Sequence, residues 1–114
     1  MRDVNHVLDF WLAPDNRPLW FKKVPAFDEE IRRRFEAVHE HAAAGKLARW
    51  QETPEGALAL VVCLDQFPRN MYRGTPRAFA TDEKARLVAD WAVDRGFDLH
   101  FKDEQVRFFF YLPF

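Results

Sequence analysis

Apolar residues recur at helical spacing along most of the chain, and no stretch alternates apolar and polar residues as a half-buried strand does. The clearest stripe runs at steps of four, four, three and four through Phe27, Ile31, Phe35, Val38 and Ala42. Similar stripes lie in residues 4–12 and 85–92, and residues 57–64 are apolar throughout. The pattern predicts an all-α fold of four to five helices, packed as antiparallel helical hairpins.

Start and stop signals refine these helices. Thr53, followed by a proline, is typical of a helix N-cap, and Thr81 and Asp103 each precede acidic first turns. Pro68 disfavours helical geometry at the residue before it, so we expect the apolar helix to stop or break near Gln66. A final helix is expected over residues 105–111.

The stretch from 57 to 74 is the part of the sequence that suggests chemistry. Eight apolar residues lead directly into a dense polar group. That group comprises Asp65, Gln66, Arg69, Asn70, Tyr72 and Arg73. The order predicts a buried helix whose C-terminal end brings several hydrogen-bonding side chains to one place.

Two interpretations of Asp65 are open. A carboxylate that follows an apolar run must be paired or hydrogen-bonded, and Arg69 lies one helical turn further on. The first interpretation is therefore a structural ion pair that fixes the helix end. The second is a carboxylate with a shifted pKa in a pocket, where it acts on a ligand.

The neighbouring polar residues have the same two interpretations. Gln66, Asn70 and Tyr72 either satisfy backbone groups that Pro68 leaves free, or recognise a ligand. Arg69, Arg73 and Arg77 recur every four residues and suggest a site for a phosphate or carboxylate.

Aromatic residues are abundant, with twelve Phe and four Trp making up most of the 16% aromatic content. Trp11 and Trp91 lie on or beside apolar stripes, which favours a place in the core. Trp20 and Phe21 fall in a loop and are the better candidates for a site. His6, on the first helix, is a hypothetical neighbour of Asp65 in three dimensions.

Composition narrows the remaining possibilities. The net charge of −1 gives no field that favours nucleic acid, and no metal, nucleotide or catalytic-triad motif is found, so we expect no cofactor. One cysteine, Cys63, fits a reducing compartment, and no apolar run is long enough for a membrane span. These features predict a cytoplasmic protein with a single helical domain over residues 1–114.

The last seven residues contain six apolar ones, although chain termini are usually polar. Either this segment folds back into the core or it forms an apolar patch for a partner. We expect a homodimer that buries part of it, through Phe108, Phe109, Phe110 and Phe114.

The nineteen-residue block from Leu64 to Asp82, including Asp65-Gln66-Phe67-Pro68-Arg69-Asn70, resembles the signature of the bacterial DUF 924 family. Val7-Leu8-Asp9-Phe10-Trp11 and the closing Tyr111-Leu112-Pro113-Phe114 agree with it. The resemblance implies a helical fold similar to tetratricopeptide-repeat proteins, with no assigned activity or cofactor. It also implies a C-terminally shortened member, since the family continues beyond this last motif.

The leading functional expectation is a small helical binding or interaction module, with a small molecule or a protein as its partner. The polar group and the Trp20–Phe21 loop would line its binding face. The alternative is an enzyme for a small polar or anionic substrate. In that case Asp65 would be the general acid or base, and Arg69 and Arg73 would hold the anion.

Overall fold

The computed structural model describes the chain from residue 2 to residue 114, with side chains from Asp3 onward, and within that range it is all-helical. The elements are α1 (Arg2–Trp11), η1 (Arg17–Leu19), α2 (Pro25–Ala43), η2 (Ala48–Glu52), α3 (Pro54–Val61), η3 (Val62–Gln66), α4 (Phe67–Met71), η4 (Pro76–Ala78), α5 (Asp82–Asp94), η5 (Asp98–His100), α6 (Glu104–Arg107) and η6 (Phe108–Phe110). Because α3, η3 and α4 are continuous, the α-helices form five bodies, and the predicted fold class is confirmed.

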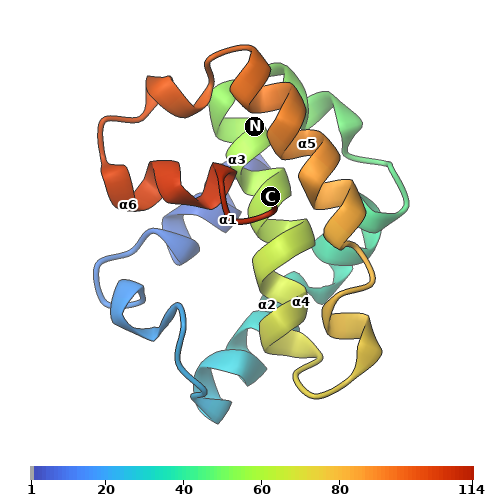
Figure 1. Cartoon of the computed structure of the whole chain (residues 1–114). Helices are drawn as coiled ribbons and strands as arrows, with labels where there is room; N and C mark the ends of the chain where they lie inside the picture. The colour runs from blue at the N-terminus through green and yellow to red at the C-terminus, as the bar shows by residue number, and fades with distance from the viewer. Residues whose placement is uncertain (1) are drawn as a thin grey trace.

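The continuous helix formed by α3, η3 and α4 occupies the centre of the molecule (Figure 1). Helix α2 packs against α4 and η3, while α1 and α5 pack against α3. The last residues of the chain cross in front of this central helix in Figure 1, where η6 contacts α3. An element surrounded on all sides must be apolar on all sides, which explains why residues 57–64 show no polar face.

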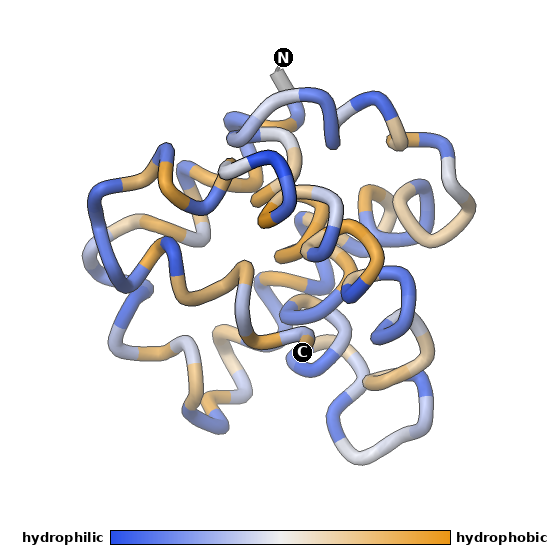
Figure 2. Tube along the Cα trace, turned by 45° about the horizontal axis from the view of Figure 1, so that its top comes forward, coloured by the Kyte–Doolittle hydropathy of each residue, from blue (hydrophilic) through white to orange (hydrophobic). Residues whose placement is uncertain are grey.

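The core follows from this arrangement. Every residue from Gly56 to Pro68 is buried, and the apolar stripe of α2 contributes Phe27, Ile31 and Phe35 to the same core. Figure 2 shows hydrophobic residues gathered on the inner turns and hydrophilic residues on the outer loops. In the part of the chain that the structure describes, no helix is both long enough and apolar enough to cross a membrane.

Pro68 does not end the central helix, contrary to the expectation from sequence. The backbone widens into a π-helical turn over Val62–Gln66, in which the Phe67 N–H donates to the Val62 carbonyl, five residues back. Pro68 then occupies the first turn of α4, where a missing N–H matters least. The wider turn absorbs the proline, so the chain continues as a helix to Met71.

Side chains from other elements satisfy the carbonyls that this turn and Pro68 leave free. His39 Nδ1 on α2 donates to the Cys63 carbonyl at 2.7 Å, and the Thr81 hydroxyl donates to the Leu64 carbonyl at 2.6 Å. The Arg69 guanidinium donates to the Asp65 carbonyl. One of the two interpretations of Gln66, Asn70 and Tyr72 gave them this role, but their side chains donate instead to the carboxylates of Asp65, Asp28 and Glu36.

The expected helix caps have two outcomes. The Thr53 hydroxyl accepts from the Gly56 N–H, and the Asp103 carboxylate accepts from the Gln105 N–H, so both caps are confirmed. Thr81 does precede a helix, α5, but its hydroxyl is used on Leu64 and caps nothing. The final helix is shorter than predicted, because α6 ends at Arg107 and a 3₁₀ turn follows.

Candidate functional site

The polar group after the apolar run separates into three networks. In the first, Asp65 is 2% exposed and lies between Gln66 and Arg69. The Gln66 amide donates to Asp65 Oδ2 at 2.8 Å, and Arg69 Nη1 donates to Asp65 Oδ1 at 3.1 Å. Arg69 also holds both oxygens of Asp82, at 3.0 and 3.1 Å. Asp65 and Arg69 thus form the ion pair that the first interpretation requires, and Asp82 is a further partner that the sequence did not indicate.

The electrostatic environment of Asp65 is balanced between opposing effects. Burial raises the pKa of Asp65 above its ordinary value, while the Arg69 charge and the Gln66 hydrogen bond lower it, and the nearby Asp82 charge raises it. Burial is the largest of these effects. The carboxyl is therefore less acidic than an exposed aspartate, although it is paired.

The second network joins α4 and the residues after it to α2. Asn70 donates to Asp28 Oδ1 at 2.8 Å, and Arg73 donates to both oxygens of Asp28, at 3.0 and 3.2 Å. Asp28 is in the first turn of α2, where the helix dipole also favours its negative charge. Arg73 is therefore committed to a carboxylate of its own chain.

The third network surrounds Tyr72. Its hydroxyl donates to Glu36 at 2.6 Å and accepts from Arg77 at 2.9 Å, while the Arg77 guanidinium lies 3.9 Å from the centre of the Tyr72 ring. Burial and the hydrogen bond to Glu36 raise the pKa of Tyr72 to about 12. Arg69, Arg73 and Arg77 thus belong to three different networks and do not converge on one anion.

Each polar group in these networks is paired with the protein itself. Among the five surface hollows described below, none is lined by Asp65, and both its carboxylate oxygens are engaged. Arg69 and Arg73 are each held by a carboxylate. The geometry gives no support to Asp65 as an acid or base, and it favours a structural role for the cluster.

A different region offers an accessible surface, formed by the loop before α2 and the segment around α6. This hollow of about 400 Å³ is called the aromatic groove here. Its lining consists of Arg17, Trp20, Phe21, Glu104, Gln105 and Phe108. Phe21 is 65% exposed and Phe108 is 48% exposed, whereas Trp20 is buried. The sequence indicated the Trp20–Phe21 loop, but Arg17, Glu104 and Gln105 carry no local signal, because only the fold brings them there.

The aromatic groove rests on a fixed base. The buried Phe109 ring stacks with Phe21 at a centroid distance of 6.2 Å and meets Trp20 edge-on at 4.7 Å. The Trp20 indole N–H donates to the Trp11 carbonyl at 2.8 Å. Arg17 lies over the Trp20 ring and forms an ion pair with Asp103 at 2.7 Å, which ties the loop to the start of α6. The exposed Phe21 ring is therefore held in position by contacts within the protein.

The C-terminal phenylalanines divide between core and surface. Phe109 and Phe110 are fully buried within the protein's own core, whereas Phe108 and Phe114 are exposed. The expectation that all four residues form a dimer interface is therefore wrong for Phe109 and Phe110. In a 3₁₀ turn successive side chains point in different directions, so neighbouring phenylalanines face opposite environments.

His6 lies away from the Asp65 network. Its ring packs against Phe35 at a centroid distance of 5.1 Å, and it lines a hollow of about 350 Å³ with Asp9, Glu30 and Arg34 among its neighbours. Two further hollows lie beside Arg73 and beside Leu87. None of these three combines an exposed aromatic ring with a fixed base as the aromatic groove does.

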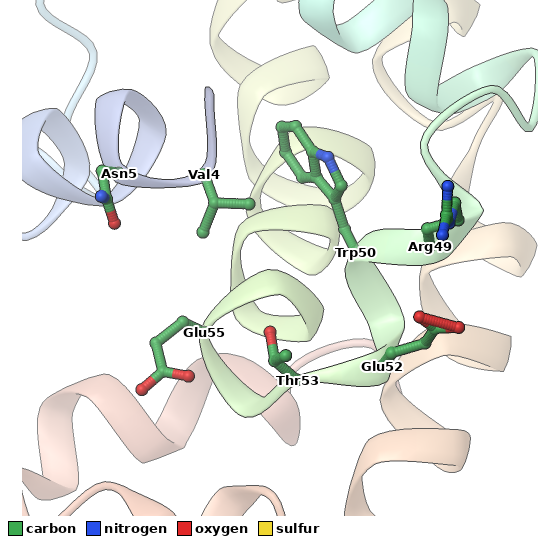
Figure 3. A pocket seen from close by; sticks show the side chains of 7 residues that line it. All are labelled: Val4, Asn5, Arg49, Trp50, Glu52, Thr53 and Glu55. Atoms are coloured by element: carbon green, nitrogen blue, oxygen red, sulfur yellow. The ribbon is translucent and has the colours of Figure 1, made fainter. Parts of the chain in front are cut away.

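The largest of the five hollows, about 730 Å³, lies at the start of α3 (Figure 3). Val4 and Trp50 form its apolar side, and the carboxylates of Glu52 and Glu55 point to opposite sides of it. Glu55 is paired with His100 at 2.9 Å. These two carboxylates therefore do not converge on a common point.

The cysteine thiol and the possible metal ligands do not indicate a further site. Burial raises the pKa of the Cys63 thiol, which disfavours the reactive thiolate. Across residues 2–114, no group of three or more His, Cys, Asp and Glu side chains is placed to hold a metal ion.

Fold and site together define a small all-helical protein with a self-paired polar cluster and an exposed aromatic groove. Residues 7–114 match the profile of the family described as bacterial protein of unknown function (DUF924), and the chain belongs to that family. A solved structure of a protein of unknown function from Agrobacterium tumefaciens is 45% identical, with a TM-score of 0.90. The likeness covers 98% of this chain but 62% of the Agrobacterium chain. No curated protein matches the sequence.

Proposed function

We propose that this protein is a helical interaction module that binds an apolar segment of a protein partner in the aromatic groove. The observation that carries the proposal is the position of Phe21, which is 65% exposed while it stacks on a fully buried ring. An aromatic side chain held rigidly in solvent loses little conformational freedom when a partner covers it. Such residues are typical anchors of protein interfaces.

Three finer points remain predictions. The resemblance to tetratricopeptide-repeat domains, the cytoplasmic location and the homodimer each await a test of their own. For the homodimer, Phe108 and Phe114 are the members of the predicted set that stay accessible.

A peptide selection tests the proposed function. Random peptides displayed on phage are selected on the immobilised protein, with a Phe21→Ser Phe108→Ser variant used for counter-selection. The Phe79→Ser variant is a matched control, because Phe79 is the same residue type, is 60% exposed and lies outside the groove. We expect enriched peptides to bind the wild type and Phe79→Ser equally, and to lose at least about tenfold in affinity for the groove variant.

The proposal also fixes the result that would contradict it. Peptides that bind the groove variant as well as the wild type would place the binding surface elsewhere. Failure to enrich any peptide would leave the exposed rings without a recognition role. The variants must first show the far-ultraviolet circular dichroism and melting behaviour of the wild type, so that lost binding is not lost folding.

A further inference from the structure

We propose that the occupant of the aromatic groove is a proline-rich segment in the extended polyproline II conformation, with a basic residue beside its prolines. This inference rests on the proposed function and adds the class of the partner segment. Three features of the groove carry it: hydrogen-bond donors without acceptors, exposed aromatic rings on a fixed base, and a carboxylate without a partner.

Two side chains that line the groove keep hydrogen-bond donors free. The Gln105 side-chain oxygen accepts from Arg17 Nη1 at 3.1 Å, but the Gln105 amide N–H groups donate to no atom of the described residues. Arg17 donates through Nε to the Leu12 carbonyl and through Nη1 to Asp103, while its Nη2 has no acceptor in the same part of the chain. These contacts orient both side chains. The groove can therefore offer hydrogen bonds to the carbonyl groups of a ligand.

Free donors favour a ligand whose backbone carbonyls are unpaired. A helix uses its carbonyls internally, except in its last turn. A polyproline II segment has no internal hydrogen bonds, so its carbonyls are available to Gln105 and Arg17. Proline also has no backbone N–H that would lose a water partner when the segment is covered. A ligand strand would need a sheet edge for its N–H groups, and residues 2–114 contain no strand.

The aromatic rings suit the side chains of such a segment. Phe21 and Phe108 are exposed, and the buried Phe109 ring supports Phe21 from below. Proline-rich segments bind in aromatic-lined grooves because their preformed conformation has little freedom to lose. Residues three positions apart lie on the same edge of a polyproline II helix, about 9 Å from each other. We therefore expect two prolines at this spacing to contact the rings.

The rim of the groove sets the charge of the segment. Arg17 is neutralised by Asp103 at 2.7 Å, whereas Glu104 takes part in none of the ion pairs that the described residues form. One negative charge on the rim is therefore uncompensated, and a lysine or arginine beside the prolines would complement it. Exposed charges of this kind act mainly on the rate of association and on its salt dependence, so the preference is secondary to the other contacts.

The test titrates three blocked peptides into the full chain and follows them by ¹H–¹⁵N NMR. The first peptide has six prolines with an arginine at each end, the second has the same prolines with serine ends, and the third is an amphipathic helical peptide with arginine ends. We expect both proline peptides to bind saturably and to shift the side-chain amide resonances of Gln105, with the arginine-ended peptide binding more tightly. Because a helix cannot accept from the free donors, it should bind at least about tenfold more weakly than the arginine-ended proline peptide.

Four variants separate the contributions. Phe21→Ser should weaken both proline peptides at least about tenfold, and the control Phe79→Ser less than about twofold. Gln105→Glu keeps an oxygen to accept from Arg17 but removes the amide donor, so it should weaken the serine-ended peptide about fivefold. Glu104→Gln should weaken the arginine-ended peptide a few-fold and reduce its salt dependence, and it should leave the serine-ended peptide unchanged.

The outcomes separate this inference from the proposed function. If phage-selected peptides bind the groove but neither proline peptide does, or if the helical peptide binds more tightly, the inference fails while the proposed function stands. Wild-type affinity of Gln105→Glu for the serine-ended peptide would also overturn the inference, because the free donor would then have no role. Self-association that Phe21→Ser abolishes, without binding of either proline peptide, would make the occupant a second copy. Binding of proline and selected peptides alike that Phe21→Ser leaves intact would overturn both proposals.

Discussion

The polar cluster around η3 buries a carboxylate and two amides beneath neighbouring elements, whereas the aromatic groove leaves two phenylalanine rings in solvent. In the cluster, Asp65 is 2% exposed and its oxygens are bonded to Gln66 and Arg69. In the groove, Phe21 is 65% exposed and the face it turns to solvent has no counterpart. The polar groups of the first region are paired within the protein, whereas the second region leaves apolar surface exposed, and that is where we propose that a partner binds.

This difference shows how misleading residue type alone can be. Asp, Gln, Arg and Asn close together look like a catalytic or binding set, yet here they satisfy one another and join α2, α4 and α5. Phenylalanine looks like core material, yet some of it forms the accessible surface. Function therefore has to be sought where the interactions are incomplete, and substitutions should separate the two regions cleanly.

The largest effect is expected at the base of the groove. Phe109→Ala removes a fully buried ring that contacts Trp11, Trp20 and Phe21, and it should lower the free energy of unfolding by about 3–5 kcal/mol. Its neighbour Phe108 is 48% exposed, so Phe108→Ala should cost under about 1 kcal/mol. Urea denaturation of both variants measures the contrast. Equal losses would mean that the two rings do not differ in burial in solution.

The next largest effect concerns the π-helical turn. Thr81→Val keeps the shape of the side chain but removes the hydroxyl that donates to the buried Leu64 carbonyl. Leaving that carbonyl unpaired should cost about 1–3 kcal/mol. Binding of groove-dependent peptides should not change, because the groove lies in other elements. A loss of binding in a stably folded Thr81→Val variant would show that the two regions are coupled.

A second substitution tests whether Pro68 is the reason why the Leu64 carbonyl needs the Thr81 hydroxyl. Pro68→Ala restores a backbone N–H one turn after Leu64, where it can replace the missing hydroxyl. In a double-mutant cycle, Pro68→Ala should recover part of the Thr81→Val loss. Strictly additive effects would show that Pro68 is not the reason why the Leu64 carbonyl needs Thr81.

The helical fold was predictable from the sequence because the pattern that reports it is local. The stripe on α2, the cap at Thr53 and the cap at Asp103 depend only on nearby residues. Both caps are as predicted, and four of the five stripe residues are buried, while Val38 is half-buried and His39 is buried beside it. The continuous helix through Pro68 was not predictable in this way. A π-helical turn needs distant partners such as His39 and Thr81 to satisfy its carbonyls, and residues 62–68 alone do not indicate these partners.

The candidate site was predictable only in part for the same reason. The Asp65–Arg69 pair follows from a spacing of four, but its third member, Asp82, comes from another helix. Trp20 and Phe21 were chosen because they lie in a loop, whereas Glu104 joins them from more than eighty positions away. Burial also separates Phe108 from Phe109, which the sequence presents as equivalent.

A smaller effect is expected where the polar cluster meets solvent. Arg73→Lys keeps the charge but loses the two-pronged contact with both oxygens of Asp28. Because Arg73 is partly exposed, solvent screens the pair, and the loss should be about 0.5 kcal/mol. Thermal unfolding at low and high salt measures it. A loss as large as that of Thr81→Val would mean that this network is as enclosed as the one around Asp65.

The smallest effect separates the two regions by the sign of their pH dependence. Burial raises the pKa of Asp65, whereas the hydrogen bond from Arg17 holds the pKa of Asp103, beside the groove, below its ordinary value. As the pH falls through the folded pKa of Asp65, the folded protein takes up a proton before the unfolded chain does. The free energy of unfolding therefore rises. That gain is complete below the unfolded pKa of about 3.9 and is lost again as the pH rises.

For Asp103 the order is reversed. Its stabilising contribution is present above about pH 3.9 and is lost as the pH falls through its lower folded pKa, because the unfolded chain then takes up the proton first. The Asp65→Asn and Asp103→Asn variants isolate each group, since asparagine keeps the cap on α6 and the Gln66 amide can turn to pair with Asn. Measured from pH 7 to pH 3, the stability of wild type minus variant should rise for Asp65 and fall for Asp103. If the stability difference changed with pH in the same direction for both variants, Asp65 would be solvated and paired like a surface carboxylate. The polar cluster would then not be closed to solvent, and its contrast with the open groove would be wrong.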